Sequence, residues 1–352
     1  MALPIRKLRL GDSAGREMER NLWTDRFVTA AMGVNGKTEQ VKVRYRGGHT
    51  REYPKRSYDV VRGGVTYHYN AEYDDPSMIR NALSFIFFPM LGVQAPQCRH
   101  VQLYVNGDYQ GVYLEIESVG RRFFKRRGIG ASALFYAINN NADFGLYYPD
   151  SYEPKSSLLT GYEHRFGGDE EKRRLVSFIR SFNRPDSRNP ASNLERSLDV
   201  NNYLRWLAGA VLSGNYDGFE QNYAIYRHRA SGKYRIIPWD YEGTWGRNCY
   251  GRIQDDDLVP VLGYNHLTDR LMDHRQFRIQ YRGILQQALE GPFTRTRLMP
   301  IVNKLVSEIS APYRQDPLRK WSYSDFLEEP NVIRRYITAR REIVYRELRK
   351  IV

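Results

Sequence analysis

The chain has 352 residues, of which 41% are hydrophobic and 13% aromatic, and its 54 Lys and Arg against 40 Asp and Glu give a formal net charge of +14. This apolar content excludes a disordered polyelectrolyte, because it can bury enough surface to offset chain entropy, and the length suits one large domain or two packed lobes. The basic excess indicates an anionic partner, which could be nucleic acid, membrane headgroups or a phosphorylated ligand.

Other features narrow the class of protein further. Two cysteines, Cys98 and Cys249, exclude a disulfide scaffold and a four-cysteine zinc site. No apolar run reaches the roughly 20 residues that a membrane helix needs, so we expect no membrane span and a soluble intracellular protein. The sequence also lacks His-x-x-x-His and Cys-x-x-Cys spacings and the full Walker motif Gly-x-x-x-x-Gly-Lys-Ser/Thr, which argues against a transition-metal hydrolase and a P-loop ATPase.

The N-terminal third is predicted to consist mainly of strands. Residues 41–45 alternate apolar and polar side chains before the turn residues Gly47 and Gly48. Two hairpins are expected, one turning at Gly63-Gly64 and one over residues 100–117 that turns at Asn106-Gly107. Between them, Asp75-Pro-Ser precedes apolar residues at helical spacing and predicts a helix start.

After residue 117 the pattern becomes mainly helical. One short hairpin is expected over residues 223–237, and residues 183–193, which are polar and contain two prolines, are expected to form a loop. The predicted helices cover residues 123–127, 170–182, 200–213, 267–272, 276–289, 294–309 and 331–350.

The segment Asn215-Tyr-Asp-Gly-Phe-Glu-Gln-Asn-Tyr223 is the sharpest candidate for chemistry. Asp217 and Asn222 lie five residues apart in a loop between a helix and a strand, and Asp240 ends the next strand. Protein kinases place an acceptor-orienting Asp, a metal-binding Asn and a metal-binding Asp in this order. Glu242 could add a further carboxylate. The alternative is that Asp217 is a turn residue and Asp240 a solvated strand end.

The second candidate is Arg46-Gly-Gly-His49, followed by Lys55 on a returning strand. Such a glycine turn could place a cation on nucleotide phosphates, although a basic surface hairpin would have the same pattern. A lysine in this role also needs a carboxylate nearby, and the candidates for it are Glu72, Asp74 and Asp75. Basic runs at residues 121–127 and 334–341 mix cations with aromatics and fit either a nucleic-acid surface or solvated helix faces.

Taken together, these motifs resemble the CotH family of atypical protein kinases. The resemblance extends over nearly the whole chain, and its segments occur in the family's order. They are Tyr45-Arg-Gly-Gly-His49, Pro54-Lys-Arg-Ser-Tyr58, Asn70-Ala-Glu-Tyr73, Asp75-Pro-Ser77 with Arg80-Asn81, Gly111-Val-Tyr-Leu-Glu115, Tyr203-Leu-Arg-Trp-Leu-Ala-Gly209, Asn215-Tyr-Asp-Gly-Phe219 and Pro238-Trp-Asp-Tyr-Glu-Gly-Thr-Trp-Gly246.

The resemblance implies an α+β, kinase-like bilobal fold, with a strand-rich N-lobe over residues 1–117 and a mainly helical C-lobe over residues 118–352. It implies ATP and Mg²⁺ or Mn²⁺ as cofactors. By position, Asp217 matches the catalytic Asp, Asn222 the loop Asn and Asp240 the metal-binding Asp, while Glu242 stands where the family often has a second Asp.

For nucleotide binding, the resemblance implies Lys55 as the phosphate-contacting lysine, with Arg56 the alternative in a register shifted by one. Arg46 in the glycine turn is expected to assist. Glu117 ends the strand that leads into the interlobe connector, where a kinase holds adenine.

The implied activity is transfer of the ATP γ-phosphate to serines of spore coat proteins, which is needed for coat assembly. The expected partners are serine-rich, basic coat proteins rather than nucleic acid, and the expected location is the mother-cell cytoplasm and then the spore coat. Two alternatives stay open, namely a non-enzymatic basic coat or nucleic-acid-binding protein and a kinase-like enzyme that transfers a nucleotide. The oligomeric state is not predicted.

Overall fold

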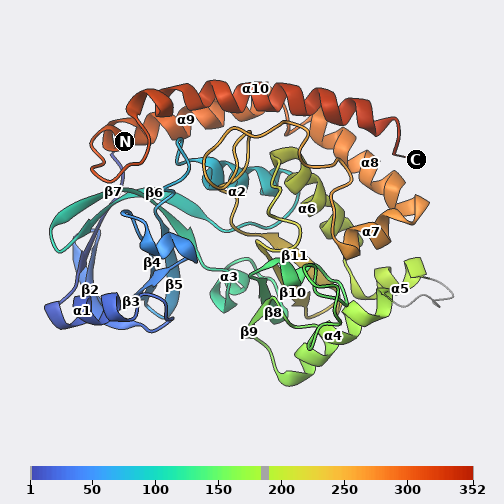
Figure 1. Ribbon diagram of the computed structural model, residues 1–352, viewed down its shortest axis with the longest axis horizontal. Helices are drawn as coiled ribbons and strands as arrows, with labels where there is room; N and C mark the ends of the chain where they lie inside the picture. The colour runs from blue at the N-terminus through green and yellow to red at the C-terminus, as the bar shows by residue number, and fades with distance from the viewer. Residues whose placement is uncertain (1, 184–189, 352) are drawn as a thin grey trace. The chain divides into compact units, whose positions relative to one another are not determined.

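The computed structural model describes residues 2–183 and 190–351 and has an α+β architecture (Figure 1). By its internal contacts the chain divides into two compact units. The barrel unit comprises Met1–Ala82, Pro96–Ser118 and Met299–Asn331, and the helical unit comprises Leu83–Ala95, Val119–Leu298 and Val332–Val352. The α+β class is as predicted. A division after residue 117 would assign residues 83–95 to the N-terminal part and residues 299–331 to the C-terminal part, but by their contacts they belong to the helical unit and the barrel unit, respectively.

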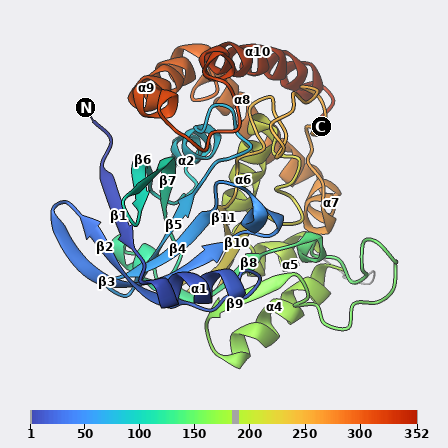
Figure 2. The same ribbon diagram turned by 60° about the vertical axis from the view of Figure 1, so that its left-hand side comes forward.

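Seven strands of the barrel unit close in the order β1-β2-β3-β4-β5-β7-β6, with β1 parallel to β6 and the other neighbours antiparallel (Figure 2). The strands are β1 (Ile5–Arg9), β2 (Val28–Val34), β3 (Lys37–Arg46), β4 (Ser57–Arg62), β5 (Val65–Asn70), β6 (Cys98–Val105) and β7 (Asp108–Glu117). Between the strands lie α1 (Asp12–Arg20), the 3₁₀ turn η1 (His49–Glu52) and the start of α2 (Arg80–Met90). Both predicted hairpins are present, but strands β1 and β2 were not predicted.

Alternation of side chains along the strands builds the barrel core. Val43 stands opposite Val60, and Tyr58 stands opposite Tyr69 on the next strand, so apolar residues from adjacent strands share one face. These four residues are buried in a single hydrophobic cluster. The polar residues between them in sequence therefore project from the opposite face.

The stretch 299–331 belongs to the barrel unit because buried polar side chains attach it there. It contains most of α9 (Arg295–Arg314) and the first turns of α10 (Tyr323–Leu348). Glu329 pairs with Arg80 at 2.7 Å, Lys320 pairs with Asp74, and the Trp321 indole donates to the Asp74 carbonyl at 3.0 Å. Removing one partner from such a pair would leave a buried charge uncompensated.

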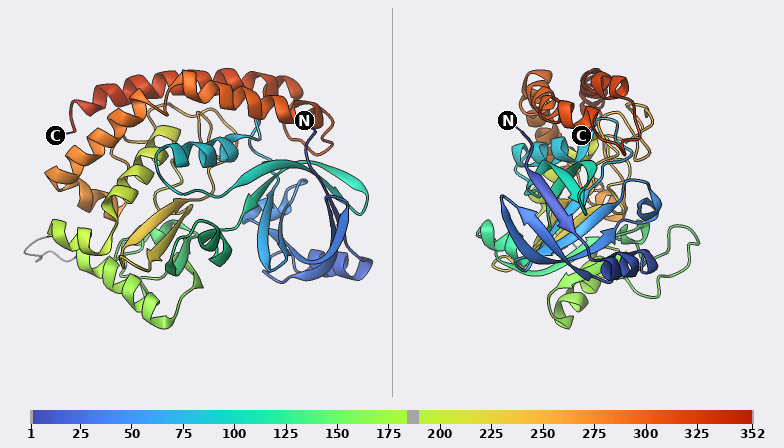
Figure 3. Two further views of the ribbon diagram at one scale, coloured as in Figure 1. Left: turned by 180° about the vertical axis from the view of Figure 1, so that it is seen from behind. Right: turned by 90° about the vertical axis from the view of Figure 1, so that its left-hand side faces the viewer.

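The helical unit contains a four-stranded sheet in the order β11-β10-β8-β9. Its strands are β8 (Ala131–Ala137), β9 (Tyr162–Phe166), β10 (Tyr223–His228) and β11 (Tyr234–Pro238). Helix α6 (Val200–Ser213) packs beside β11 and against α8 (Figure 3). The other helical segments are α3 (Arg121–Arg126), the 3₁₀ turn η2 (Asn140–Ala142), α4 (Asp169–Phe182), α5 (Pro190–Ser197), α7 (His266–Met272) and α8 (Arg275–Glu290).

Three differences from the sequence-based expectation concern this unit. Strands β8 and β9 widen the single expected hairpin into a sheet. Of the loop predicted over residues 183–193, residues 184–189 lie outside the described part of the chain. Residues 190–193 begin α5, because proline is compatible with the first turn of a helix. Within the described residues, no helix is both long and apolar enough to span a membrane.

Candidate active site

Helix α6 delivers the loop that carries Asp217. Its N-terminus is capped by Asp199, whose carboxylate accepts from the Asn202 amide at 3.1 Å, and it ends at Gly214 with φ of 71°. A side chain at Gly214 would approach the Tyr336 hydroxyl to 2.4 Å, so both conformation and packing require glycine there. The chain therefore leaves the helix abruptly and enters the loop 215–222.

Within this loop, Asp217 lies beside the two amides that follow it. The Gln221 side chain donates to one carboxylate oxygen at 2.6 Å, and the Asn222 side chain donates to the other at 3.1 Å. Asp217 and Asn222, which the sequence pattern singled out for their five-residue spacing, are therefore in direct contact. The hydrogen bonds orient the carboxylate, and Gln221 is a neighbour that the sequence pattern did not single out.

The β10–β11 hairpin places Asp240 next to this loop. Tyr223 pairs with Pro238 in the sheet, and the Trp239 amide then donates to the Asn222 carbonyl at 3.1 Å. Asp240 is the next residue along the chain. Asn222 and Asp240 both adopt φ of 58°, a left-handed conformation that non-glycine residues rarely adopt and that is concentrated at functional sites.

The segment that follows Asp240 is anchored in the core of the helical unit. The Trp245 side chain is fully buried and donates to the Ser84 hydroxyl at 2.9 Å, while its backbone amide donates to the Ser213 carbonyl at 2.7 Å. A side chain at Gly243 would come within 2.7 Å of the Cys249 amide nitrogen. The motif Pro238–Gly246 thus carries Asp240 near its start, while Trp245 and Gly243 pack its later part against the rest of the helical unit.

The electrostatics at this end of the sheet favour a cation. Burial and the charge of Asp240 raise the pKa of the Asp217 carboxyl, although the amide hydrogen bonds oppose this shift. Burial also raises the pKa of the Cys249 thiol, and the negative charges of Asp217, Glu242 and Asp240 raise it further. Glu242 therefore contributes negative charge at Cys249 together with Asp217 and Asp240.

Cys249 is an unpredicted neighbour of this site. Its sulfur lies 2.9 Å from the hydroxyl of Tyr216, the residue that precedes Asp217. Nothing in the spacing of the sequence relates these positions, because 33 residues separate them.

The donor atoms that this end of the sheet offers are of the kind that suits Mg²⁺ or Mn²⁺. Within residues 2–183 and 190–351, no group of three or more His, Cys, Asp or Glu side chains is arranged to hold a metal ion. Asn222, Asp240 and Glu242 offer oxygen atoms, which are the ligands that hard divalent cations prefer, and such ions usually complete their shell with water and phosphate. These residues fit the implied metal.

In the barrel unit, Arg46 lies at the end of β3, immediately before the glycine turn. Its guanidinium bonds the Asn70 side chain and lies 3.5 Å from the Asp59 carboxylate. Gly47 has φ of 103°, and a side chain there would collide with the Thr50 hydroxyl at 2.1 Å. The first glycine of the Arg46-Gly-Gly-His49 motif is therefore required by the turn itself.

Lys55 has a partner that the sequence pattern did not indicate. Its ammonium donates to the Asp316 carboxylate at 2.7 Å and to the Val112 carbonyl at 2.7 Å, and its side chain is only 1% exposed. Of the three carboxylates considered from the sequence, Glu72 bonds Asn81 and its charge also acts on Lys55, whereas Asp74 pairs with Lys320 and Asp75 with Arg80. A residue 261 positions away could not be identified from local spacing.

The two other predicted nucleotide-binding positions also lie in the barrel unit. Arg56 pairs with Glu19 at 2.6 Å and covers the ring of Tyr45. Glu117 is buried at the end of β7, where its amide donates to the Gln97 carbonyl at 2.8 Å. Their roles toward a nucleotide stay predictions.

Comparison with known proteins adds evidence that is independent of this geometry. The family model described as "CotH kinase protein" matches residues 43–344. The chain is 38% identical to "Inner spore coat protein H" of Bacillus subtilis (strain 168), covering 97% of this chain and 96% of the relative. It is 25% identical to "Inner spore coat protein H-like protein" of the same strain, covering 84% and 87%.

Among solved structures, the chain is similar to a protein described as "Helicobacter pylori proinflammatory kinase CtkA", with a TM-score of 0.32 and 10% identity, covering 80% of this chain and 94% of that one. At this score the likeness supports no conclusion about fold or function.

Proposed function

This chain belongs to the CotH kinase protein family, and from that premise we propose that it is an atypical protein kinase that transfers the γ-phosphate of ATP to serine residues. The observation that carries the proposal is the convergence of Asp217, Asn222 and Asp240. A helix end and a hairpin bring the three together, and the charge of Asp240 acts on the Asp217 carboxylate, so a cation bound there would be stabilised by both.

We propose Asp217 as the catalytic residue. Its carboxylate would accept a hydrogen bond from the substrate serine hydroxyl and aim that oxygen at the γ-phosphorus. The amides of Gln221 and Asn222 hold the carboxylate in one orientation. The raised pKa of Asp217 brings it nearer to the range in which a carboxylate can take up a proton as the oxygen attacks.

Asp240 and Asn222 are proposed to hold one or two Mg²⁺ or Mn²⁺ ions, with Glu242 as a further oxygen donor. When bound, the metal neutralises charge on the phosphates of ATP. The chain's own contribution is to keep these oxygen donors at adjoining backbone positions, which the bond between the Trp239 amide and the Asn222 carbonyl does.

The barrel unit is proposed to bind the nucleotide. We propose Arg46 and Glu117 for this task, and both are residues of this unit, as is Lys55, to which the family resemblance assigns the phosphate contact. A bilobal kinase-like arrangement of the two units is part of the same proposal.

Spore coat proteins are the proposed substrates, because two relatives carry the name of an inner spore coat protein or of one like it. On this proposal the enzyme acts in the mother-cell cytoplasm and then resides in the coat. Exposed acidic residues such as Asp255 and Asp257 could attract serine-rich, basic substrates to a chain that carries a net charge of +14.

The proposal is tested by incubating the purified chain with ATP, Mg²⁺ or Mn²⁺ and serine-rich coat proteins, followed by intact-mass analysis of each protein. A phosphate adduct on serine supports the kinase. An AMP adduct would instead indicate nucleotide transfer, and no adduct with any metal or coat protein, together with salt-sensitive DNA binding, would favour a non-enzymatic basic protein.

A further inference from the structure

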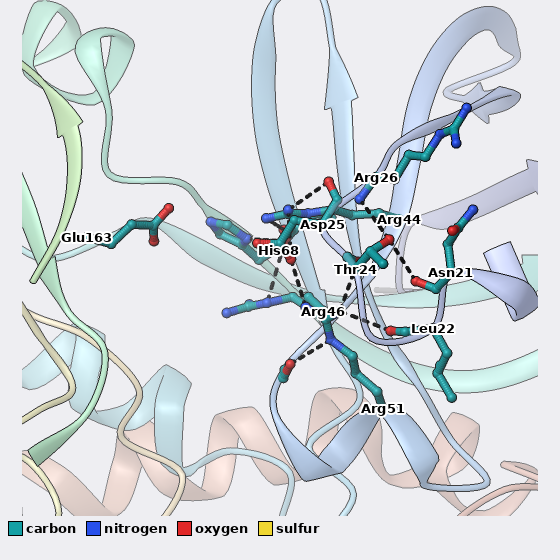
Figure 4. Close-up of polar contacts among 12 residues, drawn as sticks. Asn21, Leu22, Thr24, Asp25, Arg26, Arg44, Arg46, Arg51, His68 and Glu163 are labelled. Atoms are coloured by element: carbon teal, nitrogen blue, oxygen red, sulfur yellow. Dashed lines mark hydrogen bonds and ion pairs between the residues drawn. The ribbon is translucent and has the colours of Figure 1, made fainter. Parts of the chain in front are cut away.

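The face of the barrel opposite its core carries a row of charged side chains on three adjacent strands. Arg44 on β3 stands opposite Asp59 on β4, and Asp59 stands opposite His68 on β5. Arg46 lies two residues beyond Arg44, so its side chain leaves β3 on the same face. Figure 4 shows Arg44, Arg46 and His68 gathered on these strands.

A single carboxylate orients this row. Asp59 accepts from Arg44 at 2.9 Å and from His68 at 2.6 Å, and lies 3.5 Å from Arg46. Its side chain is 5% exposed, while those of Arg44 and Arg46 are 16% and 17% exposed. Although burial raises the pKa of Asp59, His68, Arg46 and Arg44 together hold it well below its usual range. Asp59 is thus an anion at neutral pH that fixes two guanidinium groups.

The loop beside this row is fixed as well. Arg51 donates to the Gly47 carbonyl at 2.7 Å and to the Leu22 and Thr24 carbonyls, each at 2.9 Å (Figure 4). It also pairs with Asp25 at 2.9 Å, which pairs in turn with Arg44 at 3.0 Å. The glycine turn that follows Arg46 is therefore held by a preformed network, which lowers the entropic cost of binding a ligand there.

Lys55 has the opposite setting. Asp316 neutralises its charge, and the same Asp316 oxygen accepts from the Val112 amide at 2.9 Å. The ion pair is therefore buried and bonded to the backbone of β7. The buried Lys55 ammonium already donates to Asp316 and to the Val112 carbonyl, so binding a phosphate would require it to give up or share these contacts. Arg46 carries the planar guanidinium that suits bidentate binding of a phosphate, and its side chain is 17% exposed whereas that of Lys55 is 1% exposed.

We infer that Arg46 is the cation that binds the nucleotide phosphates, that Asp59 and Arg44 position it, and that Lys55 is a structural residue which joins residue 316 to the barrel. This inference rests on the proposed function for its ligand, a nucleoside triphosphate. It goes beyond the family resemblance, which assigns the phosphate contact to Lys55 and no role to Asp59 or Arg44.

The test is calorimetric titration of the full chain with Mg²⁺-ATP, tripolyphosphate and adenosine. Loss of one charge-assisted contact is expected to weaken ATP and tripolyphosphate binding about 10- to 100-fold in Arg46→Ala. Adenosine binding should not change, because adenosine lacks the phosphates. Lys42→Ala is the matched control, since Lys42 lies two residues before Arg44 on the same face, is exposed and carries the same charge. It should change affinity by less than about twofold.

The role of Lys55 needs a variant that still folds. Lys55→Met combined with Asp316→Asn removes both charges, and the single amide oxygen of the asparagine can still accept one of the two bonds that Asp316 takes from the Val112 and Leu318 amides. This double variant should bind ATP within about twofold of wild type. Asp59→Asn should raise the KM for ATP and leave the KM for the protein substrate unchanged, which general unfolding would not do.

The outcomes separate this inference from the proposed function. If the wild-type chain binds ATP and transfers phosphate but Arg46→Ala binds ATP normally, the inference is wrong and the kinase stands. A loss of ATP affinity in the folded Lys55→Met, Asp316→Asn variant as large as that in Arg46→Ala would also overturn it. A wild-type chain that binds neither ATP nor tripolyphosphate would remove the proposed function itself.

Discussion

At the scale of single residues, the proposed chemistry centres on Asp217, whose environment disfavours its ionised form. Burial and the nearby Asp240 raise its pKa, so the folded state binds a proton at Asp217 more readily than the unfolded state does. The stabilising contribution of a protonated Asp217 is present at low pH and is lost as the pH rises through its folded-state pKa. At neutral pH the ionised carboxylate therefore opposes folding.

Asp217→Asn should consequently keep or raise the melting temperature at pH 7, while the phosphoryl-transfer rate falls by orders of magnitude. The reason is that the amide removes charge repulsion with Asp240 but cannot accept the serine proton. Differential scanning calorimetry measures the melting temperature, and a phosphoryl-transfer assay measures the rate. A clear fall in the melting temperature would show that the carboxylate stabilises the fold.

The pH dependence of the rate follows from the same shift. In the proposed mechanism Asp217 must be ionised to take up the serine proton, so kcat/KM should rise with pH through a pKa above that of an ordinary aspartate. The acidic limb of a pH–rate profile measures it. A limb at the usual aspartate pKa, or a limb that Gln221→Ala leaves in place instead of moving upward, would contradict the hydrogen-bonded environment described for Asp217.

At the scale of elements, the Lys55–Asp316 pair joins the segment before β4 to the turn after α9, and both side chains also bond the backbone of Val112 on β7. Asp316 is fully buried and accepts from Lys55, from the Val112 amide at 2.9 Å and from the Leu318 amide at 3.0 Å. Gly111, which precedes Val112, makes room for the carboxylate. A side chain at Gly111 would lie 2.1 Å from the carboxylate carbon of Asp316.

Asp316→Ala should lower the free energy of unfolding by about 3–5 kcal/mol, since it leaves a buried ammonium without its counter-charge. The Lys55→Met, Asp316→Asn double variant should lose much less, because neither charge remains. Urea denaturation of the three proteins gives the comparison. Equal losses in the single and double variants would mean that shape rather than charge compensation holds the contact.

Gly111→Ala should destabilise the chain by more than Gly107→Ala does. Both glycines have similar positive φ angles, 102° and 98°, but a side chain at Gly107 would meet nothing within 4 Å. The backbone strain, about 1–3 kcal/mol, is therefore common to both, and the difference between them measures the collision with Asp316. Equal unfolding free energies would argue against the close approach at Gly111.

At the scale of the whole molecule, the barrel unit is assembled from three separate stretches of chain. Arg80 is fully buried between Asp75 and Glu329, and Lys320 pairs with Asp74. A fragment of residues 1–117 would lack Glu329, Asp316 and Lys320. We expect it to be unfolded alone, whereas adding a peptide of residues 299–331 should restore strand-rich circular dichroism. A folded 1–117 fragment would contradict the structural role of the later segment.

The sequence predicts the parts of the molecule that depend on local patterns. Turn residues at positions 63–64 and 106–107 indicated the two hairpins, and alternation around Val43 indicated strand β3. The spacing of Asp217 and Asn222 indicated a loop, in which the two are in contact. What it could not predict depends on long-range contacts. Asp316 as the partner of Lys55, Glu329 as a partner of Arg80 and Cys249 beside Tyr216 are each set by tertiary packing.

The same limit explains the division of the chain. A change in composition near residue 117 marks the end of β7, but residues 299–331 join the barrel unit through buried ion pairs that leave no local signal. The family motif residues Asp75, Ser77 and Arg80 are correspondingly structural, since all three are buried and bonded to one another.

The central claim is that the acidic site at the end of the β10–β11 hairpin performs metal-dependent phosphoryl transfer. The most direct measurement is the rate of phosphate transfer from γ-labelled ATP to a coat protein by wild type, Asp240→Asn and Lys42→Ala, with Mg²⁺ or Mn²⁺ and with EDTA. We predict transfer by wild type and Lys42→Ala that EDTA abolishes, and a rate lower by orders of magnitude for a folded Asp240→Asn. Near wild-type transfer by Asp240→Asn would contradict the account.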